Sequence, residues 1–318
     1  MKRLVSGLCI ASLVLSSMVF ATPLDKTKVM KEATWTVHLD VDQFRQSVFG
    51  KEVINELAAR GVSEKLDNFA KVFSFHPIND IQCVTLFGQD KDPQKAAAII
   101  RGTCNPATLV AMVGMNPYYE KSEYGTYTIH SWIDEKKGPD SPRQYGCFYN
   151  PTTLLMGVGK ETLQQSLDVL DGKHANAAGN AMFNQFAEGS HGVIVSLFAE
   201  KTGETVNGIQ EAAILQQTNR IALMLGEKDN SAYTDILLQA RNAAEATKIQ
   251  QFVQGMLAMV SLSVADKNPK LDQLINAVNL QCNNDTVRAQ LNWDSKDLIA
   301  LLKQLEQAKH AQEAAAAQ

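Results

Sequence analysis

Segments in which every second residue is apolar recur along the chain, and they constrain its fold more than any other feature. In residues 33–41 the apolar side chains stand at 35, 37, 39 and 41, with Thr36, His38 and Asp40 between them. Successive side chains of a strand point to opposite faces, so this pattern predicts a half-buried strand whose polar side faces solvent. Further strands are expected at 81–88, 96–102, 124–133, 145–149, 153–158, 191–198, 220–226, 233–240, 278–282 and 286–293.

Helical patterns alternate with these strands. Asp42 is expected to cap a helix that carries apolar residues at 44, 48, 54 and 57, and Asn105 with Pro106 opens a helix that runs to 113. Residues 160–171 predict a helix that stops at Gly172, a long helix follows residue 240, and a last one carries leucines at 298, 302 and 305. This mixture predicts an α+β fold of two similar units, each an antiparallel sheet with helices packed on one face.

The order of the elements suggests an internal repeat. Residues 85–92 align without gaps on 223–230, and the same register places 98–100 on 236–238. We therefore expect a duplicated unit, although two unrelated hairpin units with similar amphipathic patterns are the alternative. The predicted organisation is a first unit at 22–172, a linker with a short helix at 173–190, a second unit at 191–310 and an alanine-rich tail at 311–318.

The first 21 residues have the pattern of a secretory signal peptide. Lys2 and Arg3 precede an apolar stretch at 4–20, and Val19 and Ala21 are small residues three and one positions before a cut after Ala21. An uncleaved anchor is the alternative. The pattern predicts an exported protein, periplasmic or extracellular, with no membrane span after signal cleavage.

The charge of the chain argues against one class of partner. The formal net charge is −4, and removal of Lys2 and Arg3 would make it −6. Proteins that bind nucleic acid usually present a basic face, so we expect no nucleic-acid partner. The hydrophobic fraction of 45% is enough to build a core.

Four cysteines follow the predicted signal. An exported protein can form disulfides, and four cysteines allow three complete pairings, among which the sequence does not choose. No C-x-x-C spacing points to zinc or thiol redox chemistry, and ordinary buried thiols are the alternative. The candidate disulfide cysteines are Cys83, Cys104, Cys147 and Cys282.

Three stretches resemble a group of exported bacterial proteins that have no assigned activity. They are VTLFGQDKDPQKAAAIIRG at 84–102, YTIHSW at 127–132 and LDVLDGK at 167–173. The likeness covers most of the chain after residue 21, but its motifs are a hairpin, a strand and a helix stop. The resemblance implies export and a duplicated α+β unit, and it carries over no functional residue.

The chain lacks the motifs of common enzyme classes, such as G-x-S-x-G, H-E-x-x-H and the P-loop. The best metal-like arrangement is His38, Asp40 and Asp42, because residues two apart on a strand share a face. A solvated strand face is the alternative interpretation. A Cys–His pair between His130 and one of the cysteines at 83, 104 and 147 is a further candidate.

Aromatic residues are concentrated between 118 and 149 and could either line a binding groove or pair across strands. From these observations we expect a non-enzymatic protein of the cell envelope or exterior that binds a ligand or a protein partner, with no cofactor. The alternatives are an exported hydrolase with a dispersed active site and a structural or assembly protein.

Overall fold

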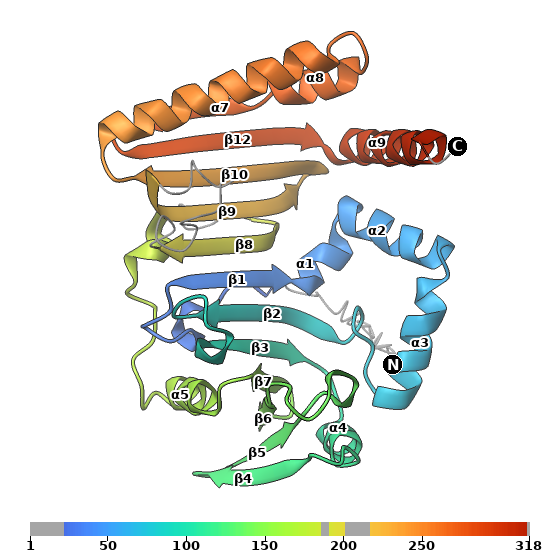
Figure 1. Cartoon of the computed structure of the whole chain (residues 1–318), viewed down its shortest axis with the longest axis vertical. Helices are drawn as coiled ribbons and strands as arrows, with labels where there is room; N and C mark the ends of the chain where they lie inside the picture. The colour runs from blue at the N-terminus through green and yellow to red at the C-terminus, as the bar shows by residue number, and fades with distance from the viewer. Residues whose placement is uncertain (1–21, 186–190, 201–216, 317–318) are drawn as a thin grey trace, which may run out of the picture.

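The computed structural model describes residues 22–185, 191–200 and 217–316. Within them, twelve strands form one sheet in the order β11-β12-β10-β9-β8-β1-β2-β3-β7-β6-β5-β4, and each neighbouring pair is antiparallel. Figure 1 shows these strands stacked along the long axis of the molecule. The α+β class is confirmed, and the strands of the two predicted units lie side by side in a single sheet.

The strands agree closely with the alternating segments of the sequence. One additional strand, β4, pairs with β5 where the sequence predicted a single strand at 124–133. Before residue 173 the strands are β1 (Trp35–Asp40), β2 (Ile81–Gly88), β3 (Ala96–Gly102), β4 (Glu120–Tyr124), β5 (Tyr127–Trp132), β6 (Gln144–Asn150) and β7 (Thr153–Gly157). Later strands are β8 (Val193–Glu200), β9 (Thr218–Lys228), β10 (Ser231–Ala240), β11 (Asn279–Asn283) and β12 (Thr286–Asp294).

The first helical segment differs from its prediction. Asp40, and not Asp42, caps it, because the Asp40 carboxylate accepts a hydrogen bond from the Gln43 backbone N–H. Ser47 then ends one helix and caps the next. The helices are α1 (Val41–Gln46), α2 (Val48–Ala59), α3 (Val62–Phe73), α4 (Pro106–Val113), α5 (Lys160–Leu170), α7 (Ala243–Val264), α8 (Pro269–Asn276) and α9 (Ser295–Ala316).

The two sets of strands share an order. From the centre outwards the first reads β1-β2-β3-β7-β6, to which β5 and β4 are added, and the second reads β8-β9-β10-β12-β11. The two sets meet where β1 pairs with β8, from Trp35 opposite Ala199 to Leu39 opposite Val195. Because this pair is continuous with its neighbours on both sides, the sheet has no edge in the middle of the molecule.

One face of the sheet carries the main hydrophobic core. Phe87, Ile99 and Leu155 on the strands pack with Leu163 and Leu167 of α5. The 3-10 helices η1 (Lys26–Lys28) and η4 (Ala181–Gln185) lie at this core. Further core residues come from η4 itself and from segments near the two 3-10 helices: Val29, Met30, Ala177, Met182 and Phe183. The part of the predicted linker that precedes residue 184 therefore contributes side chains to the core.

The prediction that the polar side of β1 faces solvent was wrong. Thr36, His38 and Asp40 are buried, whereas the apolar side chains between them are only half-buried. The reason is that β1 is a central strand, and the N-terminal segment from Thr22 crosses its polar side. His38 and Asp40 are hydrogen-bonded to that segment and to β2 instead of to water, whereas the buried Thr36 hydroxyl has no hydrogen-bond partner among the described residues.

A buried carboxylate joins elements from both ends of the chain. Glu227, near the end of β9, accepts hydrogen bonds from the backbone N–H groups of Val48 (2.5 Å) and Phe49 (3.0 Å) at the start of α2. It also accepts one from the Ser295 hydroxyl at the start of α9 (2.8 Å). Both helices therefore present their N-terminal ends to one negative charge, which their dipoles favour.

Replacement of this carboxylate should lower the stability of the whole chain. In Glu227→Ala three buried donors lose their acceptor, which we expect to reduce the free energy of unfolding by about 3 kcal/mol. Urea denaturation followed by circular dichroism measures this change. Glu64→Ala, at an exposed position of α3, is the matched control. Equal unfolding midpoints for the two variants would contradict the anchoring role of Glu227.

Candidate functional site

A pocket of about 290 Å³ lies between the sheet face opposite the main core and the helices α3 and α4. Its floor is built by every second residue of neighbouring strands, which is the spacing that places side chains on one face. Ile100 of β3 lies opposite Leu154 of β7, which lies opposite Phe148 of β6. In the next row, Met156 lies opposite Gly146, which lies opposite His130 of β5.

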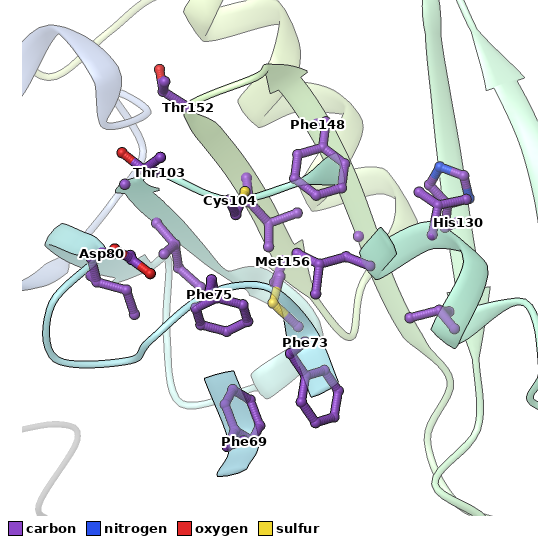
Figure 2. A pocket seen from close by; sticks show the side chains of 18 of the residues that line it. Phe69, Phe73, Phe75, Asp80, Thr103, Cys104, His130, Phe148, Thr152 and Met156 are labelled. Carbon is purple, nitrogen blue, oxygen red and sulfur yellow. The ribbon is translucent and has the colours of Figure 1, made fainter. Parts of the chain in front are cut away.

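Three phenylalanine rings form the opposite side of the pocket. Phe69 and Phe73 are stacked with centroids 4.0 Å apart on α3, and Phe75 meets Phe69 edge to face at 5.3 Å. Figure 2 shows these rings on one side and Met156 and Phe148 beyond them. Helix α4 adds further apolar walls through Leu109, Val110 and Val113.

Glycine at position 146 keeps the floor of the pocket low. A Cβ atom there would lie 3.3 Å from the Trp132 ring, which also lines the pocket. Gly102 is required for a different reason, because a Cβ there would come within 2.3 Å of the Asp80 carbonyl oxygen. These two glycines permit the close approach of the chain segments that shape the pocket.

Polar side chains on the pocket wall lie towards its two ends. Asp80, Thr103 and Thr152 lie on one side of the view in Figure 2, and His130 lies on the other. The Asp80 carboxylate accepts a hydrogen bond from the His76 backbone N–H at 2.6 Å, and the Tyr119 hydroxyl lies 2.8 Å from His130 Nδ1. The middle of the pocket is therefore surrounded by apolar side chains alone.

Two titratable groups on the wall, His130 and Cys104, are held in their neutral forms. Burial lowers the pKa of His130, and the nearby Lys121 lowers it further. Burial and the charge of Asp80 raise the pKa of the Cys104 thiol. At neutral pH the pocket thus presents an uncharged imidazole and a protonated thiol, which is a poor nucleophile.

The metal-like trio of the sequence occupies a different site on the opposite face of the sheet. His38 Nε2 lies 2.8 Å from the Thr22 carbonyl oxygen and Nδ1 lies 2.9 Å from the Thr85 hydroxyl. Because a carbonyl can only accept, Nε2 carries the proton and Nδ1 accepts from Thr85. The described residues contain no group of three or more His, Cys, Asp or Glu side chains placed to hold a metal ion.

The disulfide prediction is not supported, because all four cysteines are free and stand apart. Cys83 on β2 and Cys147 on β6 are separated by three strand spacings, roughly 14 Å, which is too far for a disulfide. Cys104 lines the pocket on the other face, and Cys282 lies on β11 near the far edge of the sheet.

The candidate residues of the sequence therefore do not form one site. Of the cysteines considered with His130, only Cys104 shares the pocket with it. Two tyrosines of the aromatic stretch contact α5 and its C-cap instead: the hydroxyls of Tyr124 and Tyr127 donate to Asp168 (2.7 Å) and Asp171 (2.6 Å). Of the aromatic residues between 118 and 149, Trp132 and Phe148 line the pocket.

Sequence reasoning missed the phenylalanines of α3. The signal was present, since Val62, Leu66, Phe69 and Phe73 follow the spacing of one helix face and are all half-buried. Those residues lie between the predicted helix that carries residue 57 and the predicted strand at 81–88, and they belong to no predicted element. That no side chain of α3 is fully buried agrees with a helix that covers a hollow instead of a packed core.

Comparisons with known proteins bear on the fold alone. No protein-family model and no curated protein matches this chain. The Treponema protein TP0453 in its crystal form III is similar in structure, with a TM-score of 0.51, 11% sequence identity and coverage of 88% of this chain and 98% of that one. Its crystal form I gives a TM-score of 0.47 at 12% identity, covering 89% and 98% of the two chains.

Across residues 22–185, 191–200 and 217–316, no helix combines the length and the apolar character that crossing a membrane requires.

The reactivity of the buried thiols should follow their environment. Burial raises the pKa of Cys83 and of Cys147 to about 11. Because the thiolate is the nucleophile, raising the pKa from 9 to about 11 lowers its fraction at pH 8 by roughly a hundredfold. We expect iodoacetamide to modify both thiols at least that much more slowly in folded than in urea-unfolded protein, as measured by peptide mass spectrometry. Similar rates in the two states would contradict this burial.

Proposed function

We propose that this protein binds an apolar ligand, of the chemical class of hydrocarbon chains, in the pocket between α3, α4 and strands β3, β7, β6 and β5. The observation that carries the proposal is the combination of a hollow of about 290 Å³ with a wall built from phenylalanine and aliphatic side chains. No other feature described above offers a comparable space for a small molecule.

The size and the polarity of the pocket favour an apolar occupant over water. An engineered apolar cavity of about 150 Å³ stays dry and binds benzene, and this pocket has nearly twice that volume. Water in its middle would lack the two to four polar partners that an ordered buried water needs. A hydrocarbon group entering the pocket would gain about 0.8 kcal/mol for each methylene taken out of water.

The polar side chains at the ends of the pocket suggest how a ligand would be oriented. Thr103 and Thr152 have hydroxyls that can donate to or accept from a polar group, and His130 is uncharged. A molecule with a hydrocarbon body and one uncharged polar end would leave few of these groups without a partner. A negatively charged end would meet no cationic Lys or Arg side chain among the described residues of the wall and would lie near the Asp80 carboxylate, and desolvating a charge is costly.

The hydrolase alternative receives less support from the same pocket. Acyl or glycosyl transfer needs a nucleophile within hydrogen-bond reach of a base, or two carboxylates that flank the substrate. Cys104 has a raised pKa, and Asp80 is the sole carboxylate on the wall. The arrangement therefore favours binding over reaction.

The proposal includes the compartment and the internal repeat. The basic, apolar and small-residue pattern of residues 1–21 supports export, so the ligand would be met outside the cytoplasm. The shared strand order of the two halves supports duplication of one unit. In the second half, α7 packs directly on the sheet through Ile249 and Val253. A duplicated unit would then have kept the pocket in its first copy and filled the corresponding space in its second.

A neutral fluorescent probe tests the binding function. N-phenyl-1-naphthylamine is expected to bind the protein with a rise in fluorescence and to be displaced by fatty alcohols. Leu154→Glu places a carboxylate on the apolar floor, and we expect it to weaken binding at least about tenfold because of the cost of burying a charge.

The matched control for this experiment is Leu86→Glu. Leu86 is 42% exposed and lies outside the pocket on the same face of the sheet, so this variant should bind the probe like the unmodified protein. Failure of the unmodified protein to bind the probe, or equal binding by both variants, would refute the proposed function.

A further inference from the structure

The backbone and side chain of Thr22 are held by three buried residues of the central strand and of α1. Its backbone nitrogen donates to Asp40 Oδ2 at 2.6 Å, and its carbonyl oxygen accepts from His38 Nε2 at 2.8 Å. Its hydroxyl donates to Asp42 Oδ2 at 3.4 Å. Thr22 is thus hydrogen-bonded to groups from a segment about eighteen residues further along the chain.

The charges around Thr22 are not balanced. Asp40 and Asp42 are 1% and 4% exposed, and Arg45 is ion-paired to Asp42 alone. No Lys, Arg or His forms an ion pair with Asp40 in the part of the chain that the structure describes. Buried carboxylates are normally paired, because a charge in a medium of low polarity needs a counter-charge close by. Asp40 therefore has no counter-charge among these residues.

The sequence independently places a cleavage point at this residue. The signal-peptide pattern predicts a cut after Ala21, which would make Thr22 the first residue of the mature chain. This prediction depends on residues 2–21 only and on none of the contacts described above. The atom that cleavage would convert into a charged amine is the same nitrogen that lies 2.6 Å from Asp40 Oδ2.

We propose that hydrolysis of the Ala21–Thr22 peptide bond creates an α-ammonium group on Thr22, and that this group is the buried counter-ion of Asp40. One water molecule is consumed and the C–N bond breaks. Ala21 leaves with a carboxylate, and the Thr22 amine takes up a proton. The new ammonium has three N–H donors where the peptide had one, so it can remain bonded to Asp40 and also reach towards Asp42.

The segment after Thr22 is built to hold the new terminus in place. Pro23 restricts the backbone directly after it, and Leu24 packs against the main core. The contact from His38 to the Thr22 carbonyl oxygen fixes the other side of the residue. Ordering the terminus therefore costs little additional conformational entropy, and the ion pair can form in a fixed geometry.

Processing would consequently strengthen the fold. In an uncleaved chain the Thr22 nitrogen is a neutral amide, and Asp40 remains a buried carboxylate whose pKa is raised by burial and by the repulsion of Asp42. After cleavage the carboxylate is paired. The mature form is expected to be the more stable one, whatever ligand the pocket binds.

The first test determines the terminus itself. N-terminal sequencing or intact-mass analysis of the protein exported from cells that carry the full chain should show Thr22 as the first residue. Any other first residue would overturn the proposal.

The second test separates the charge from the chain length. The chain that starts at Thr22 is compared with the same chain carrying one additional glycine before Thr22, which moves the ammonium away and restores an amide. The Thr22 chain should have a melting temperature higher by roughly 3 °C or more. The difference should vanish in Asp40→Asn and persist in the control Asp140→Asn, whose carboxylate is exposed. Equal melting temperatures for the two unmodified chains would overturn the proposal.

A third measurement does not depend on how well Asp40→Asn folds. Acetylation of the terminal amine at pH 8, followed by mass spectrometry, should be much slower for Thr22 in the folded chain than for the additional glycine in the extended one. Equal rates would show that the Thr22 amine is free in solution and would overturn the ion pair.

Discussion

The pairing of β1 with β8 is the contact on which the rest of the structure depends. It joins two sets of strands with the same order into one sheet. It also covers one strand edge of each set, β1 and β8, that would otherwise be exposed. The same pairing places β1 in the centre of the sheet, where the segment from Thr22 covers the polar side of the strand. The burial of His38 and Asp40 follows from that position and not from their own chemistry.

The two faces of the sheet are covered differently. On one face, α5 and the segments around η1 and η4 fill the space with close-packed apolar side chains. On the other, α3 and α4 rest on the floor of β3, β7, β6 and β5 and leave a hollow. The difference lies in the covering helices: Leu163 and Leu167 of α5 are fully buried, whereas α3 reaches the strands only through large rings at its end. A packed core and a pocket can therefore share one sheet.

Several buried polar contacts connect elements that are distant in the chain. Glu227 accepts hydrogen bonds from the starts of both α2 and α9. Exposed ion pairs between Arg60 and Glu306 and between Lys303 and Glu52 also connect these two segments. Exposed pairs contribute little each, so the buried carboxylate is the stronger contact. Asp40 has the same role at the N-terminal segment. In both cases a buried carboxylate accepts hydrogen bonds from backbone N–H groups.

The sequence by itself determined the strands, most helices and the α+β class, because alternation and 3.6-residue periodicity are local properties that neighbouring residues impose on each other. It also predicts, from local composition, a cleavage point between Ala21 and Thr22. Only the tertiary structure decided which side of β1 is buried, since that depends on the pairing with β8 and on the segment that crosses it. The pocket likewise depends on α3, β3, β7, β6 and β5 meeting in space, and the separation of Cys83 from Cys147 depends on strand order. These are contacts between residues far apart in the chain, and no local pattern encodes them.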